Sequence, residues 1–298
     1  MELWIPITVA AAFSQNLRSA FQKQLKAALS TWGATGARFV FAAPIAIALA
    51  IAVLLLGENG MPQTNATFFS YGALGGLAQI AATGLLIHLF SYQNFSVATA
   101  YTKTEPIQTA LFGIVLLGDV LSLEIAIAIL VSLFGVVLIS IPKGRLGYKG
   151  WLNKRALIGI ASGGLFGLSA VAYRGTSLSL EAGDTFFRAS MTLAYVTILQ
   201  SVIILALLRI KEPGQTAALF KNWRLAGLVG LTGMIGSLAW FIAFTMENAA
   251  HVRAVGQIEV VFMLGASIFF FKERVTAREI SGVILVSLGI LALILVSG

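Results

Sequence analysis

A lysine, a glutamate and a proline lie within four positions of one another in an otherwise apolar stretch, AYTKTEPIQTALFG, at residues 100–113. A carboxyl group such as that of Glu105, placed among apolar groups, can exchange a proton close to neutral pH. Pro106 has no amide to bond the carbonyl of Thr102, so it bends a helix at this point. These residue types indicate proton exchange and the binding of a polar ligand.

One side of this stretch is too polar to face lipid if the stretch forms a helix. A carbonyl left free by proline at membrane depth is tolerated only inside protein or beside a water-filled cavity. We therefore predict that the stretch is a cavity wall near the midplane of a membrane. The polar stripe, at helical spacing, consists of Tyr101, Thr102, Glu105, Gln108, Thr109 and Phe112.

Other charged residues also interrupt apolar segments. A charge at the centre of a membrane helix costs about 3 kcal/mol, so each must be paired, hydrated or close to an interface. Depth along the segments, at about 1.5 Å per residue, distinguishes these residues. Arg18 and Arg188 lie about two turns from a segment end, and Arg174 and Arg253 are expected to reach outward to acids at the surface. Nearest the midplane we expect Arg38, Lys103, Glu105 and Glu259.

Arg38 is the expected cationic partner of Glu105, because Lys103 is only two positions away and points to another side of the helix. An alternative stays open, in which Arg38 and Lys103 each neutralise one carboxylate and only hold helices together. Trp240 could likewise line a pocket or belong to the core. The predicted substrate- and proton-binding set is Glu105, Glu259, Arg38, Lys103, Arg188, Tyr101, Thr102, Gln108, Gln257 and Trp240.

The chain that must position these residues is 298 residues long, 58% hydrophobic and only 11% charged, with a mean hydropathy of +0.91. Soluble domains carry about 25% charged residues, so the solvent for this surface is lipid. The apolar stretches are continuous, as in VILVSLGILALILV at residues 283–296, and therefore predict helices rather than barrel strands. The first residues, MELWIPITVAAAF, lack a basic region and are predicted to be the first span rather than a cleaved signal.

Several kinds of chemistry are excluded by missing residues and motifs. Cysteine is absent, which excludes disulfides and thiolate chemistry. The nucleotide motif G-x-x-x-x-G-K-[ST] and the hydrolase motifs H-E-x-x-H and G-x-S-x-G are also absent. We predict no metal site, no cofactor and no enzymatic activity, and we expect any transport to be driven by a gradient rather than by ATP.

Breaks in hydrophobicity divide the chain into ten predicted spans with short connections. Connections on one side contain 14 of the 20 Lys and Arg, whereas the other side, with both termini, has none. Because Lys and Arg stay cytoplasmic during insertion, both termini are predicted to be extracytoplasmic. The net charge of +8 is then an orientation signal, and nucleic acid is not an expected partner. The spans are residues 3–25, 30–57, 67–91, 95–118, 121–141, 155–178, 182–209, 223–246, 249–271 and 275–296.

The two halves of the chain, residues 1–148 and 149–298, resemble each other. A shift of 154 positions places Glu105 on Glu259 and Gly135 on Gly289, and a shift of 150 places Arg38 on the position of Arg188. Five spans in each half is an odd number, so the second half must be inverted relative to the first. We therefore predict an all-α integral membrane fold of ten helices in two inverted five-helix repeats, an arrangement typical of secondary transporters.

The ends of the two halves, LLGDVLSLEIAIAILVSLFGVVLI and FFFKERVTAREISGVILVSLGILAL, resemble the end of each EamA repeat, and GARFVFAAPI resembles the start of the second helix in that family. The likeness covers the whole chain. It departs from the family at Asp119, where a glutamate is usual, and at Ala128, which aligns with Gly282 but replaces a usual glycine. The resemblance to EamA-type drug/metabolite transporters implies ten helices, a central cavity and the export or exchange of small metabolites, amino acids or drugs.

Together these features predict a secondary transporter in the cell inner membrane that exports or exchanges a small polar or amphiphilic metabolite, amino-acid-like or drug-like, by proton antiport. The alternatives are a flippase or carrier of a lipid-linked substrate, an uncoupled facilitator of the same fold and, from another class, an intramembrane enzyme. Expected partners are the small-molecule substrate, protons, membrane lipid and, as an option, a second copy of the chain in a homodimer.

Overall fold

The computed structural model describes residues 2–57, 60–91, 102–140, 154–262, 265 and 277–297, and every regular element in these ranges is helical. Five helical segments are long and apolar enough to cross a membrane, namely Thr31–Leu56, Ala66–Leu89, Leu157–Leu178, Thr185–Lys211 and Trp223–Met246. The α-helices are α1 (Trp4–Leu25), α2 (Thr31–Val40), α3 (Ala43–Leu56), α4 (Ala66–Leu89), α6 (Glu105–Leu117), α7 (Leu123–Ser140), α8 (Lys154–Leu178), α9 (Thr185–Lys211), α10 (Gln215–Lys221), α11 (Trp223–Met246), α12 (Ala249–Val255) and α14 (Ala277–Ser297).

Four of the ten predicted spans, 95–118, 121–141, 249–271 and 275–296, extend beyond the part of the chain that the structure describes. Residues 92–101 and most of 263–276 lie outside it, which removes the start of span 95–118 and the end of span 249–271. The connection 141–153, which contains the predicted boundary between the halves, is also outside. Ten spans therefore stays a prediction, whereas an all-helical fold with five clear membrane-length helices is established for the described residues.

Local sequence signals set where several helices begin. Ser30, Asn65, Asp184 and Asn248 each precede a helix and accept a hydrogen bond from a backbone amide two or three residues on, at 2.8 to 2.9 Å. Such N-caps satisfy amides that have no partner within the helix. These four residues therefore define the starts of α2, α4, α9 and α12.

The predicted span 30–57 is divided into two helices. α2 ends at Val40, α3 begins at Ala43, and the two residues between them form a turn. Pro44, the second residue of α3, has no amide for the carbonyl of Val40, so a continuous helix is interrupted here. The break leaves Arg38 in the last turn of α2, inside the protein.

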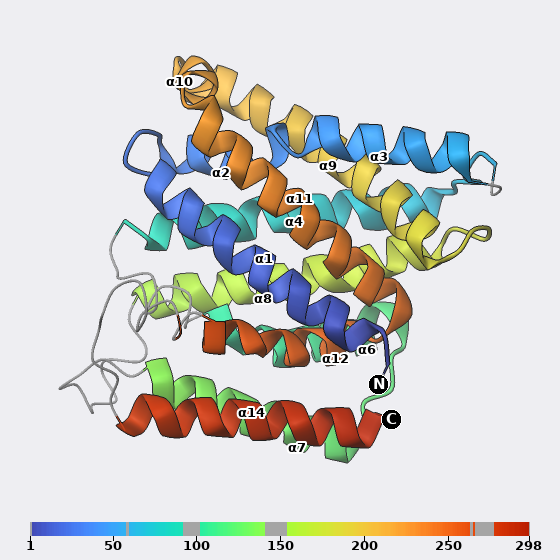
Figure 1. Ribbon diagram of the computed structural model, residues 1–298, viewed down its shortest axis with the longest axis vertical. Coiled ribbons are helices and arrows are strands. Elements are labelled where there is room, and N and C mark those ends of the chain that lie inside the picture. The colour runs from blue at the N-terminus through green and yellow to red at the C-terminus, as the bar shows by residue number, and fades with distance from the viewer. Residues whose placement is uncertain are drawn as a thin grey trace.

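Helices distant in sequence pack in pairs (Figure 1). α1 lies along α11, α4 along α8 and α7 along α14, while α6 packs against α8. Glycines allow close contact: a Cβ atom on Gly135 would lie 2.6 Å from the carbonyl oxygen of Gly282, and one on Gly289 would lie 2.7 Å from the amide of Ser132. Small residues at such crossings are typical of helix packing in membranes.

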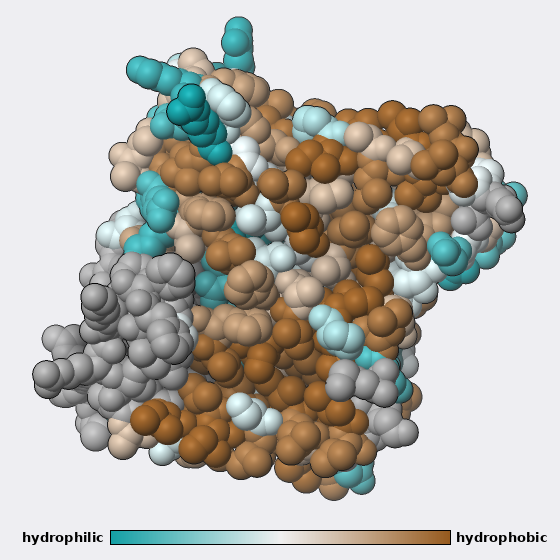
Figure 2. Space-filling view, in the orientation of Figure 1, coloured by the Kyte–Doolittle hydropathy of each residue, from teal (hydrophilic) through white to brown (hydrophobic). Residues whose placement is uncertain are grey.

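Basic residues gather at one end of the helices, and apolar side chains cover much of the surface between the two ends (Figures 1 and 2). The N- and C-termini lie on the same side of the molecule. The other side carries the ends of α1 and α9, the starts of α8 and α11, and α10. Its described basic residues include Lys23, Lys26, Lys154, Arg209, Lys211, Lys221 and Arg224.

Candidate functional site

Both buried carboxylates lie where a short 3₁₀ turn becomes an α-helix. The turn η1 (Thr102–Thr104) ends directly before Glu105, and η3 (Gly256–Ile258) ends directly before Glu259. At Pro106, where the sequence predicts a bend, the 3₁₀ turn η1 gives way to the first turn of α6. Proline is favoured in the first turn of a helix because it would disrupt the helix interior. The two turns occupy positions that the 154-residue shift makes equivalent, so the backbone presents the carboxylates in the same way.

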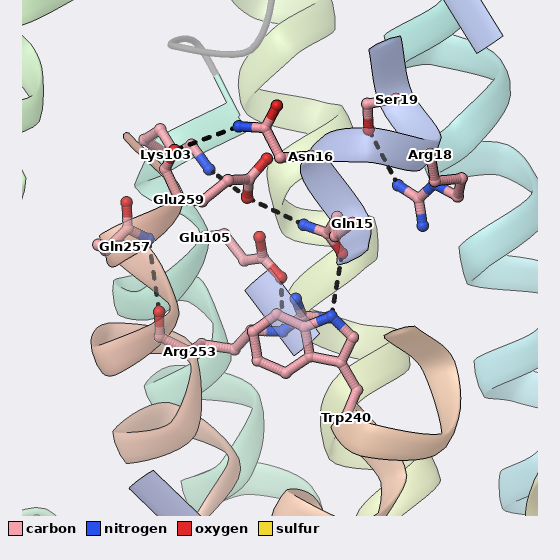
Figure 3. A network of polar contacts seen from close by, with 10 residues as sticks. All are labelled: Gln15, Asn16, Arg18, Ser19, Lys103, Glu105, Trp240, Arg253, Gln257 and Glu259. Carbon is pink, nitrogen blue, oxygen red and sulfur yellow. Dashed lines mark hydrogen bonds and ion pairs between the residues drawn. The ribbon is translucent and has the colours of Figure 1, made fainter. Parts of the chain in front are cut away.

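Each carboxylate is paired with a cation from the other half of the chain (Figure 3). The Nζ atom of Lys103 donates a hydrogen bond to Oε2 of Glu259 at 2.8 Å, and Nε of Arg253 lies 2.8 Å from Oε1 of Glu105. The N–H of Arg253 does not point at that oxygen, so the second contact is an ion pair without a hydrogen bond. The four side chains are at most 8% exposed. The two pairs therefore hold the halves of the chain together in the interior.

Arg38 is not the partner of Glu105, and that prediction is wrong. The guanidinium of Arg38 donates hydrogen bonds to the hydroxyls of Thr83 at 3.2 Å and Ser237 at 3.4 Å. The reason is the position of α2, which packs against α4, α9 and α11. Depth along a helix predicted that Arg38 and Glu105 are near the midplane but could not reveal which helices separate them.

Arg253 does not reach outward to surface acids, and that prediction is also wrong. Its side chain is 5% exposed, and its guanidinium lies 4.4 Å from the ring centroid of Trp240 and 5.1 Å from that of Phe244. α12, which carries Arg253, has only seven residues and packs against α1, α6 and α8. Trp240 is buried in the hydrophobic core, where its ring covers the cation that pairs with Glu105; that it lines a substrate pocket stays a prediction.

Two amides of α1 complete this charge network, and the sequence analysis missed them. Gln15 donates to Oε2 of Glu259 at 3.0 Å and accepts a hydrogen bond from Nε1 of Trp240 at 3.1 Å. Asn16 donates to the backbone carbonyl of Glu259 at 3.3 Å. The signal available in the sequence was their polarity within the apolar segment 3–25, which a search restricted to charged groups does not detect.

A second polar centre contains Arg18 and Arg38. Both side chains are 3% exposed, and Arg18 donates a hydrogen bond to the hydroxyl of Ser19 at 3.2 Å. Neither arginine forms an ion pair with any carboxylate whose side chain the structure describes. Among the described side chains, the buried cations Arg18, Arg38, Lys103 and Arg253 therefore outnumber the buried carboxylates Glu105 and Glu259 by two, and an unpaired cation costs about 3 kcal/mol on membrane-insertion scales.

A small cavity adjoins Arg38. Its volume is ≈ 10 Å³, room for about one water molecule. A hydrogen-bonded group closes one side, where Tyr173 donates to Oε1 of Gln79 at 3.0 Å and Gln200 donates to the same oxygen at 3.0 Å. The structure therefore leaves little free space beside Arg38. The lining includes Arg38, Phe39, Gln79, Gln200, Ser237 and Phe241.

The remaining predicted site residues are distributed unevenly. Thr102 is buried beside Lys103. Gln257 is also buried, and its amide donates to the carbonyl of Arg253 at 3.5 Å. Gln108 faces α8 instead, where it donates to the carbonyl of Ile160 at 3.4 Å. Tyr101 lies outside the described residues.

Arg188 is not brought to the site, although its sequence position suggested this. It lies in the first turn of α9 and donates to the carbonyls of Gly183 at 2.9 Å and Glu181 at 3.3 Å. Arg174 similarly donates to the carbonyls of Phe244 at 2.9 Å and Glu247. Both arginines satisfy carbonyls of neighbouring loops and helix ends. Within the described ranges, no group of three or more potential ligands is arranged to hold a metal ion.

The fold and the polar interior are those of a multi-pass membrane transporter, and comparison with known proteins identifies the family. The sequence profile of the EamA-like transporter family matches residues 2–141 and 153–295, so the chain belongs to this family. It is 22% identical to the pseudopaline exporter CntI of Pseudomonas aeruginosa (strain UCBPP-PA14) over 295 residues, 96% of this chain and 94% of that protein. The crystal structure of another protein has the same fold, with a TM-score of 0.67. The two are 16% identical, and the match covers 98% of this chain and 99% of that one.

Proposed function

We propose that the chain is a secondary transporter that exports a small polar or amphiphilic metabolite in exchange for protons. Membership of the EamA-like family and similarity to an exporter support transport and its direction. The observation that carries the coupling is the pair of buried carboxylates, each held by a cation from the other half of the chain. A protonated carboxyl no longer attracts that cation, so proton binding would weaken the contact between the halves.

Inverted repeats would explain how such a contact alternates its exposure. If α8 corresponds to α1 and α11 corresponds to α4, as the inverted repeat requires, then the packing of α8 along α4 repeats the packing of α1 along α11. The matching 3₁₀ turns before Glu105 and Glu259 support the same relation. In this proposal the two halves rock about the ion pairs, and each state exposes the interior to one side of the inner membrane.

The function can be tested by finding an exported compound and then following its movement. Small molecules in the medium of cells with and without the protein would be compared by mass spectrometry. A compound that accumulates only with the protein would then be measured in proteoliposomes under a pH gradient. We expect gradient-driven transport, and finding no compound whose export depends on the protein would contradict the proposal.

Replacing Glu105 by Gln tests the coupling itself. Glu105→Gln keeps the shape of the side chain and removes its charge change. The variant should insert and fold because Arg253 keeps its contacts with the rings of Trp240 and Phe244. Transport driven by a pH gradient should be lost, while substrate counterflow survives in part. A folded variant with normal pH-driven transport would exclude Glu105 as a coupling group.

A further inference from the structure

Two buried arginines from different helices converge on one glycine of α11. A Cβ atom on Gly233 would lie 3.3 Å from Cγ of Arg38 and 3.4 Å from Cδ of Arg18. Arg18 comes from α1 and Arg38 from α2, and both side chains are 3% exposed. The aliphatic parts of both arginine side chains thus pack against the backbone at Gly233, and a residue with a side chain at this position would displace them.

The immediate partners of these cations are neutral. Arg38 donates to the hydroxyls of Thr83 and Ser237, and Arg18 donates to that of Ser19. The Nε atom of Arg18 is buried and has no hydrogen-bond partner among the residues that the structure describes. The two carboxylates at the centre of the protein, Glu105 and Glu259, are already paired with other cations. Glu259 also attracts Arg18, but one carboxylate cannot neutralise Lys103 and both arginines, so the described side chains form an ion-pair network with too few anions.

We propose that Arg18 and Arg38 form a binding site for an organic anion, whose carboxylate or phosphate group occupies the space beside Gly233. This inference rests on the proposed transport function and assigns its substrate class. Planar guanidinium groups match oxyanions with paired hydrogen bonds. The nearby amide of Gln79 and the rings of Phe39 and Phe241 line the cavity into which the rest of the anion would extend.

The same helix links this anion site to the proton-binding network. Gln15 and Arg18 are three residues apart on α1, so they lie on neighbouring positions of one helix face (Figure 3). Gln15 bonds Glu259, and a shift of α1 that widens the site around Arg18 would therefore also disturb the contact between Glu259 and Lys103. The present cavity of ≈ 10 Å³ holds only a water, so the anion requires such a wider arrangement.

Thermal unfolding of the full-length protein in detergent tests the site without knowledge of the natural substrate. Acetate, glutarate, citrate and inorganic phosphate would be compared, at one millimolar concentration and constant ionic strength, with uncharged glutaramide and the cation putrescine. We expect at least one anion to raise Tm by about 3 °C or more. Glutaramide and putrescine should leave Tm unchanged. Separate responses to carboxylates and to phosphate identify which oxyanion the site prefers.

Variants connect the shift in Tm to the two arginines. Arg18→Gln and Arg38→Gln should each weaken anion binding by about tenfold or more, because a charged hydrogen-bond donor is lost. Arg188→Gln is the matched control, since Arg188 bonds loop carbonyls at the start of α9, and it should keep the full shift. Gly233→Ala retains both charges but crowds both stems, so it should also reduce the shift and serves if a glutamine variant does not fold.

Two results of the unfolding experiment would overturn the anion site. One is that none of the four anions raises Tm of the unmodified protein. The other is a shift that persists unchanged in Arg18→Gln, Arg38→Gln and Gly233→Ala. Export of only neutral or cationic compounds would also reject the anion site while leaving the transport function intact. Conversely, anion binding that depends on the arginines, with no compound exported, would reject the transport function and support the site.

Discussion

At the scale of single residues, the two ion pairs of the interior are not equivalent. Glu259 receives hydrogen bonds from both Lys103 and Gln15, whereas Glu105 has an ion pair without a hydrogen bond. We therefore predict that Glu259→Gln lowers the free energy of unfolding by about 3 kcal/mol, because it strands Lys103. Glu105→Gln should cost only about 1 kcal/mol, because ring contacts still hold Arg253. Thermal unfolding in detergent, monitored by tryptophan fluorescence, measures the difference.

A double variant is the control for this asymmetry. Replacing Lys103 and Glu259 together by methionine leaves no stranded charge, so most of the stability lost in Glu259→Gln should return. Pairs of well-packed apolar residues often stabilise a protein as much as a buried ion pair does. Equal losses for Glu105→Gln and Glu259→Gln would contradict the prediction and indicate that hydrogen bonding does not distinguish the two carboxylates.

At the scale of helices, close contact between α7 and α14 depends on glycine. A Cβ atom on Gly135 would lie 2.6 Å from the carbonyl oxygen of Gly282 and 2.7 Å from the amide of Val286, both backbone atoms that no rotamer change can move. Gly135→Ala should therefore force the helices apart and destabilise the protein by about 1–3 kcal/mol. Gly76→Ala is the matched control: its Cβ would lie 3.5 Å from the side chain of Gln200, and we expect little loss. Similar losses of Tm in the two variants would contradict this account of the crossing.

At the scale of the whole molecule, the separation of charge predicts orientation. Basic side chains gather where α1 and α9 end, while the two termini lie on the opposite side. Because Lys and Arg remain cytoplasmic during insertion, alkaline phosphatase fused after the last residue should be active, and green fluorescent protein fused there should be dark. Bright fluorescence with an inactive phosphatase would mean that the C-terminus is cytoplasmic and that the basic side faces outward.

The sequence by itself determined that the protein is a membrane protein, that it is helical and to which family it belongs. These properties depend on composition and on patterns along the chain. It also aligned Glu105 with Glu259 at a fixed shift, and in the structure each of them directly follows a 3₁₀ turn. The break at Pro106 was predictable for a local reason, the missing amide of proline.

Only the tertiary structure decided which charges meet. Position along a helix yields depth but neither rotation nor neighbours, so Arg38 and Glu105 share a predicted depth while Arg253 is the actual partner. The short helix α12 places Arg253 under Trp240, which a straight-helix estimate could not anticipate. The convergence of Arg18 and Arg38 on Gly233 likewise requires the packing of α1, α2 and α11, because residues so far apart in sequence are brought together only by helix–helix contact.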